Sequence, residues 1–168
     1  MTDEERRLRD EMPGLLEHLG EVAGWLGGFD VSKASALPPG SLDDLRDGLL
    51  RAIELLHALF AFRGEPPPAP EPGFAYASLG PALRRTLPQR LAAQLMDELN
   101  AVPGPRLEDL SQFTALGLFA RVTDLLRFVR FLEDERAGPA RGAAPATVAS
   151  TRRPSRAPVA AAPAPTAK

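Results

Sequence analysis

Hydrophobic side chains recur at every third or fourth position along most of residues 1–136, which is the spacing of one face of an α-helix. The clearest case is the segment 107–136, where one side carries Leu118, Val122, Leu125, Val129 and Leu132. No segment of the sequence alternates convincingly between hydrophobic and polar residues as a half-buried β-strand does. The pattern therefore predicts an all-α fold.

Capping residues and helix-breaking residues divide the chain into helices with short or proline-rich connections. The motif Thr2-x-x-Glu5 predicts a short charged first helix, and Pro13 suits the first turn of a second helix that ends at Gly27 and Gly28. Further helices are expected from Ser41 to Gly64, from the motif Thr86-x-x-Gln89 to a stop at Pro103, and over residues 107–136. We expect about four substantial helices, packed as a compact antiparallel bundle.

Two proline-rich segments set the predicted organisation of the chain. Residues 64–73 contain five prolines and interrupt the bundle, because proline has no amide hydrogen and clashes with the preceding helical turn. Residues 137–168 are rich in alanine and proline and have few large apolar side chains, so they bury too little surface to offset the entropy of ordering. The sequence thus predicts a helical bundle domain over residues 1–136 and a disordered tail over residues 137–168.

The charge is unevenly distributed between these two parts. The whole chain has 168 residues and a formal net charge of −2, but the tail holds five basic residues and no acidic one, so residues 1–136 carry −7. The chain has no cysteine, which excludes a disulfide framework and a zinc–thiolate site. Because the N-terminal residues are charged and no apolar stretch approaches the length of a membrane span, we expect a cytoplasmic protein.

Only one side-chain spacing suggests metal chemistry. Glu54 and His57 are one helical turn apart, which is half of the ligand set of a dimetal bundle site. The second half is missing, because the only other histidine, His18, has a leucine three positions before it. No phosphate-binding loop or activated nucleophile is recognisable either. We therefore expect no enzymatic activity, no metal site and no cofactor, with a small metal-binding helical protein as an alternative.

The basic tail offers a second alternative function. Arg152, Arg153 and Arg156 could attract an anionic surface, either nucleic acid or lipid, in a weak and salt-sensitive manner. The tail has no aromatic residues among its arginines, and the acidic body opposes such binding. Nucleic acid and membrane surfaces are therefore not the expected partners.

The segment 107–136 is apolar on a second side as well. This second face consists of Phe113, Leu116, Gly117, Ala120, Phe128 and Phe131. A helix that is apolar on two sides is either the central helix of its own bundle or one that buries its second face against another chain. From this pattern we expect a non-enzymatic interaction or scaffold protein that self-associates, or docks on a protein partner, through these residues.

Overall fold

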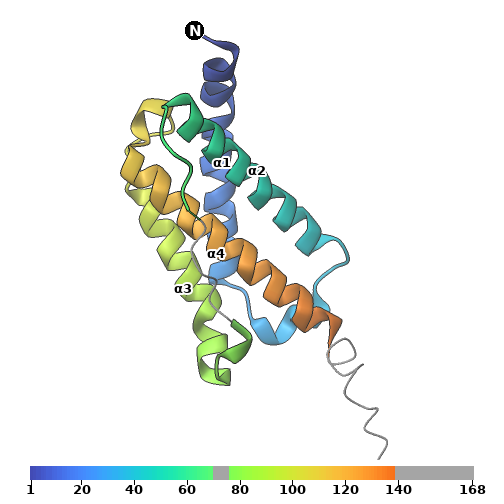
Figure 1. Ribbon diagram of the computed structural model, residues 1–168. Coiled ribbons are helices and arrows are strands. Elements are labelled where there is room, and N and C mark those ends of the chain that lie inside the picture. Colours follow the sequence, from blue (N-terminus) through green and yellow to red (C-terminus); the bar gives the residue numbers. More distant parts are fainter. Residues whose placement is uncertain (70–75, 139–168) are drawn as a thin grey trace, which may run out of the picture.

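The computed structural model describes residues 1–69 and 76–138 and consists of four long helices (Figure 1). They are α1 (Asp3–Gly27), α2 (Ser41–Phe62), α3 (Pro81–Asn100) and α4 (Gln112–Ala137). Three short 3-10 turns lie between them, namely η1 (Val31–Ala36), η2 (Tyr76–Ser78) and η3 (Leu107–Asp109). No strand occurs in the described part of the chain, so the predicted all-α bundle is confirmed.

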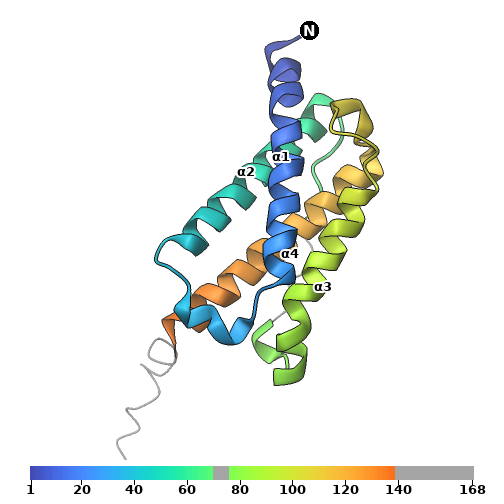
Figure 2. The same ribbon diagram turned by 180° about the vertical axis from the view of Figure 1, so that it is seen from behind.

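The four helices form a ring in which each of the four main interfaces joins antiparallel helices. The largest interfaces join α1 to α3 and α2 to α4, and α1 also packs on α2 and α3 on α4. Figures 1 and 2 show that α1 and α4 run from the N-terminal end of the molecule to the opposite end, whereas α2 and α3 both run back. Because α2 and α3 are parallel, the connection between them must return along the length of the bundle.

Helix α1 is continuous through Pro13, so the predicted break at this residue is wrong. Pro13 is exposed, where water can satisfy the carbonyl that loses its intrahelical hydrogen bond. On the opposite side, the buried residues Leu8, Met12, Leu15 and Leu19 form an unbroken stripe. The packing of this stripe outweighs the local cost of the proline. The predicted cap is confirmed, because the Oγ1 atom of Thr2 accepts a hydrogen bond from the backbone N–H of Glu5.

The starts of α3 and α4 also differ from the predicted starts. Helix α3 begins at Pro81, five residues before Thr86, because Pro81 occupies the first turn, where a missing N–H costs nothing. Pro88 lies buried inside this helix. Helix α4 begins at Gln112 rather than at residue 107, because the side chain of Ser111 caps it by accepting from the N–H of Thr114.

The predicted core face of α4 is confirmed. Leu118, Val122, Leu125, Val129 and Leu132 are all buried. They belong to a single apolar core to which all four helices and parts of their connections contribute. This core leaves eight large apolar side chains exposed on the described surface, among them Phe113 and Leu116 of α4.

Arginine side chains connect the ends of neighbouring helices. The Nη1 atom of Arg46 lies 2.6 Å from Oε1 of Glu133, which joins the first turns of α2 to the last turns of α4. At the other end of α2, the Nη2 atom of Arg63 donates to the backbone carbonyls of Leu107 and Leu110, at 3.2 and 2.5 Å. These contacts place the C-terminal end of α4 beside the start of α2.

Candidate functional site

The first turns of α4 expose two large apolar side chains. Phe113 is 84% exposed and Leu116, one turn later, is 39% exposed. Residues three apart are neighbours on a helix surface, so these two side chains form one patch. The exposure of Phe113 is the highest among the large apolar side chains of the described residues, and the next most exposed phenylalanine among them is Phe62, at 40%.

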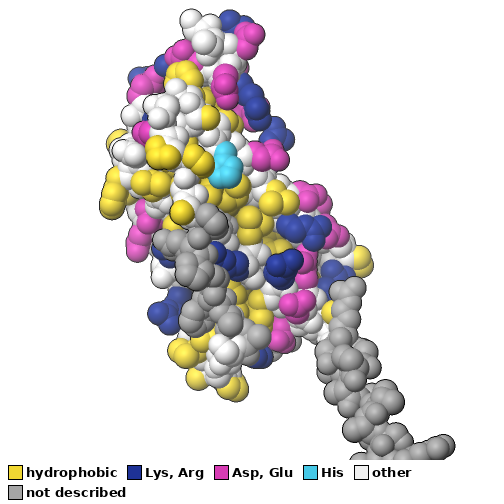
Figure 3. All heavy atoms as spheres, in the orientation of Figure 1, with side chains coloured by type: hydrophobic (Ala, Val, Ile, Leu, Met, Phe, Trp, Pro, Cys, Tyr) yellow, Lys and Arg dark blue, Asp and Glu magenta, His cyan; other side chains and the backbone are white. Residues whose placement is uncertain are grey.

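A hollow of about 260 Å³ lies beside this patch. It is lined by Leu116, Phe119, Ala120, Thr123, Asp124 and Arg127 of α4 and by Pro68 and Ala69 of the connection after α2. The ring of Phe119 is stacked on His57, with the ring centroids 5.2 Å apart, and meets Phe60 edge-on. Figure 3 shows hydrophobic side chains gathered on this face over the first half of α4. We call Phe113, Leu116, Phe119 and Ala120 the docking face.

Gly117 has a different neighbour from the rest of the predicted second face. A β-carbon added at Gly117 would lie 2.1 Å from Oε2 of Glu98, which belongs to α3. The missing side chain of Gly117 thus makes room for a carboxylate of the same chain. The small residue serves helix packing within the bundle at this position.

Phe128 and Phe131 do not belong to an exposed face. Phe128 is completely buried and Phe131 is 6% exposed. Tyr76 of η2 covers both rings, with centroid distances of 6.1 and 6.2 Å. The prediction that groups them with Phe113 as partner-binding residues is corrected here, because a part of the connection between α2 and α3 packs on this half of the second face. The pattern of α4 alone could not show which segment covers it.

Charged groups at the centre of α4 pair with one another. Asp124 lies 3.3 Å from Nη1 of Arg121 and 3.3 Å from Nη1 of Arg127. Arg121 also donates to the side-chain carbonyl of Gln94 on α3. The hydroxyl of Tyr76 donates to the backbone carbonyl of Asp124, and burial, followed by the nearby Asp124 carboxylate, raises the pKa of Tyr76. These charged and polar groups therefore form ion pairs and hydrogen bonds within the chain.

The two candidate metal ligands on α2 gain no further ligand from the fold. Glu54 and His57 are both exposed, and the ring of His57 is used in stacking on Phe119. Within residues 1–69 and 76–138 there is no group of three or more His, Cys, Asp or Glu side chains able to hold a metal ion. The described structure therefore provides no observation that favours the metal-binding alternative.

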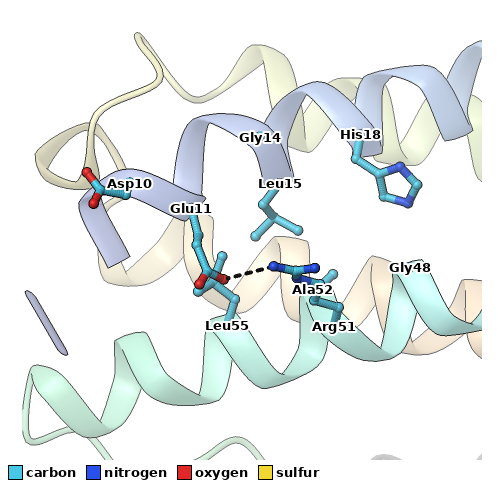
Figure 4. Close-up of a pocket in the computed structure, with 9 residues that line it drawn as sticks. All are labelled: Asp10, Glu11, Gly14, Leu15, His18, Gly48, Arg51, Ala52 and Leu55. Carbon is cyan, nitrogen blue, oxygen red and sulfur yellow. Dashed lines mark ion pairs between the residues drawn. The ribbon is translucent and has the colours of Figure 1, made fainter. Parts of the chain in front are cut away.

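A second hollow, between α1 and α2, was not predicted from the sequence (Figure 4). Its volume is about 400 Å³, and it is lined by Asp10, Glu11, Gly14, Leu15 and His18 of α1 and by Gly48, Arg51, Ala52 and Leu55 of α2. Glu11, Leu15 and His18 point from α1 towards α2, and Arg51 reaches back to within 3.7 Å of Glu11. The sequence signal was the small residues at facing positions, Gly14 on one helix and Gly48 with Ala52 on the other.

The tail residues Arg152, Arg153 and Arg156 lie outside the described residues, as does the segment 70–75 within the predicted proline-rich loop. Among the helices that the structure describes, none combines the length and the apolar character needed to cross a membrane. Comparison with known protein families, with curated proteins and with solved structures finds no match.

Proposed function

We propose that this chain is a non-enzymatic helical interaction protein that binds a protein partner through the docking face at the start of α4. The simplest partner is a second copy of the same chain. The observation that carries the proposal is the 84% exposure of Phe113 in an otherwise well-packed bundle. Transfer of a phenylalanine or leucine side chain from water to an interface is worth about 1.5–3 kcal/mol, so aromatic anchors of this kind often dominate binding.

The surroundings of Phe113 support docking rather than catalysis. Leu116, Phe119 and Ala120 extend the apolar surface into the neighbouring hollow, which could receive a side chain of the partner. Asp124 and Arg127 line the far side of this hollow and are paired with each other. A central apolar patch with charges at its edge is the usual arrangement of an interface. The proposal needs no cofactor, and a cytoplasmic location is part of it.

The proposal is tested by replacing Phe113 and Leu116 with serine in one variant. We expect the variant to lose self-association, measured by sedimentation velocity over a range of concentrations, while its unfolding midpoint scarcely changes, because exposed side chains contribute little to the fold. The matched control is Leu83→Ser, which removes a leucine that is 49% exposed on α3 and lies outside the docking face. Equal association in the variant and in the wild type would contradict the proposal.

A foreign partner is tested with a photoreactive side chain at the exposed position Gln112, next to Phe113. The full chain with this side chain should give a discrete crosslinked product. The product should still form when Leu83→Ser is added, and it should be absent when Phe113 and Leu116 are both replaced by serine. A wild-type chain that is monomeric at every concentration, and whose products do not depend on Phe113 and Leu116, would show that this face has no protein partner.

The two alternative functions have their own tests. Salt-sensitive binding of the full chain to acidic vesicles or nucleic acid, lost when Arg152, Arg153 and Arg156 are replaced by alanine, would favour an anionic-surface binder. A stoichiometric metal ion that is lost on replacing Glu54 and His57 would favour a metal-binding protein. Neither result depends on the docking face.

A further inference from the structure

The hollow between α1 and α2 is not the only one along these two helices. A second hollow of about 380 Å³ follows it and is lined by Glu21, Val22 and Trp25 of α1, by Leu37 and Pro38 of the loop before α2, and by Ser41 and Leu45 of α2. The two hollows use consecutive stretches of the same two helices. Together they form what we call the α1–α2 groove, which lies on a different part of the molecule from the docking face.

The floor of the groove is apolar, with small residues in the first hollow and larger apolar residues in the second. Gly14, Gly48 and Ala52 leave space between the helices, and larger apolar side chains close the floor. Such a floor can accept a segment with small or ring-shaped side chains lying flat between the helices. Beside Gly48 the space is already filled by the ring of His18.

The charged groups that line the groove are mostly acidic. Glu11 is near two arginines, Arg7 at 3.1 Å and Arg51 at 3.7 Å. Asp10 in the first hollow and Glu21 in the second have no ion-pair partner among the described residues. A segment that combines small apolar side chains with positive charges would therefore complement the groove in both shape and charge.

The chain itself contains such a segment beyond the end of α4. Residues 152–159 read Arg-Arg-Pro-Ser-Arg-Ala-Pro-Val, and the residues after Gly138 include five basic side chains and no acidic one. The end of α4 lies beside the start of α2, where Glu133 contacts Arg46, and Ser41 and Leu45 of the same part of α2 line the groove. The C-terminal end of α4 therefore lies near one end of the groove.

The length of the tail is sufficient for this segment to reach the whole groove. Thirteen residues lie between Gly138 and Arg152, and they can span roughly 40 Å at about 3.1 Å per residue in an extended proline-rich conformation. The 25 residues of α1 cover about 37 Å at 1.5 Å per residue. Because the tether is short, the effective concentration of the segment at the groove is on the order of millimolar, at which individually weak contacts suffice.

We propose that residues 152–159 of this chain bind along its own α1–α2 groove. The guanidinium groups of Arg152, Arg153 and Arg156 pair with the carboxylates of Asp10 and Glu21, because a guanidinium fork matches a carboxylate in geometry as well as in charge. The apolar side chains of Ala157, Pro158 and Val159 rest on the apolar part of the groove floor. The groove is thus a docking site for a basic proline- and alanine-containing segment, and the tail is its occupant.

The composition of the chain provides a direct experiment. Trp25 is the only tryptophan, it lines the groove, and it is 38% exposed, while the absence of cysteine makes Ser155→Cys a unique labelling site. We expect a nitroxide at position 155 to quench the emission of Trp25 in the full chain, relative to a diamagnetic analogue of the same label. The quenching should be lost at about 1 M salt, where the screening length is about 3 Å.

Charge variants on both sides of the contact test its specificity. Reversal of Arg152, Arg153 and Arg156 to glutamate should abolish the quenching, whereas the control reversal Arg141→Glu with Lys168→Glu should leave most of it. On the groove, Asp10→Asn with Glu21→Gln should weaken it, and the control Asp3→Asn with Glu4→Gln at the far end of α1 should not. Absence of quenching in the full chain, or quenching that survives the triple reversal, would overturn the proposal.

A mixing experiment separates the intramolecular contact from a contact between two copies. A labelled chain that carries Trp25→Phe is mixed with unlabelled wild-type chain, so that only contacts between chains can quench the remaining tryptophan. We expect no quenching in this mixture. Quenching between chains would show that the occupant of the groove is a second copy and would overturn the intramolecular proposal. The double-serine variant of the docking face should behave as wild type in all these measurements.

Discussion

The ring of His18 occupies the space that a side chain at Gly48 would need. A β-carbon added at Gly48 would lie 2.5 Å from Nε2 and 3.1 Å from Cε1 of His18. The Nε2 atom is buried and has no hydrogen-bond partner in the described part of the chain. The position of the His18 ring between α1 and α2 therefore depends on glycine at position 48.

Because of this contact, Gly48→Ala should lower the free energy of unfolding by about 1–2 kcal/mol, although alanine favours a helix over glycine by about 1 kcal/mol. His18→Ala in the same chain should restore most of the loss, and a double-mutant cycle by chemical denaturation measures this coupling. Gly24→Ala is the control, since nothing lies within 4 Å of an added β-carbon at Gly24 and the change should be neutral or stabilising. If the effects of Gly48→Ala and His18→Ala on the free energy of unfolding are additive, the clash between the two positions does not control stability.

The core face of α4 gives a second prediction. Leu125 is 2% exposed, so Leu125→Ala should cost about 2–5 kcal/mol through lost burial and the cavity left behind. Leu50→Ala on α2 removes the same atoms from a side chain that is largely exposed and should change stability by less than about 1 kcal/mol. Equal values from denaturant titration of the two variants would mean that the inward face of α4 is assigned wrongly.

The only tyrosine of the chain predicts a pH dependence at the alkaline end. Burial raises the pKa of Tyr76, whereas the unfolded chain should titrate at about 10. The folded chain then holds the phenolic proton more tightly, so this contribution to stability is complete below pH 10 and is lost as the pH rises through the folded pKa. Tyrosinate absorbance should therefore appear at higher pH in the folded chain than in denaturant. Coincident titration curves would contradict the burial of Tyr76.

The hydrogen bonds of Arg63 give a fourth prediction. Its guanidinium donates to the carbonyls of Leu107 and Leu110, on the two sides of the turn that precedes α4. Arg63→Met keeps most of the apolar stem and leaves these carbonyls without their donor, which should cost about 1–3 kcal/mol. Arg63→Lys should lose less, because the ammonium group keeps the positive charge and three N–H donors on a somewhat shorter stem. Thermal unfolding of both variants checks the order, and a silent Arg63→Met would show that water replaces the donor.

The sequence was sufficient to predict the number of long helices because hydrophobic residues recur with helical spacing along them. The stripe through Leu118 and Leu132 and the cap at Thr2 depend on local spacing, which a sequence displays directly. The break at Pro13 was predicted wrongly because the compensating contacts of Leu8 and Met12 come from distant parts of the chain. Local rules state the cost of a proline but not the packing that offsets it.

Of the residues predicted to bind a partner, only those near the start of α4 are exposed in the structure. Phe113 and Phe131 look alike in sequence, since both lie on the second apolar side of the last helix. What separates them is Tyr76, which is distant in sequence and covers the later phenylalanines. The α1–α2 groove escaped prediction for a related reason, because the meeting of Gly48 with His18 depends on how two helices are aligned with each other.

The pairing of α1 with α3 and of α2 with α4 means that the two halves of the sequence are interleaved. Neither the half that contains α1 and α2 nor the half that contains α3 and α4 holds both sides of a principal interface. A nick in the connection between α2 and α3 would therefore separate two fragments that each expose the surface meant for the other. Such fragments are suited to reconstitute the bundle only when they meet, as in a split-protein reporter.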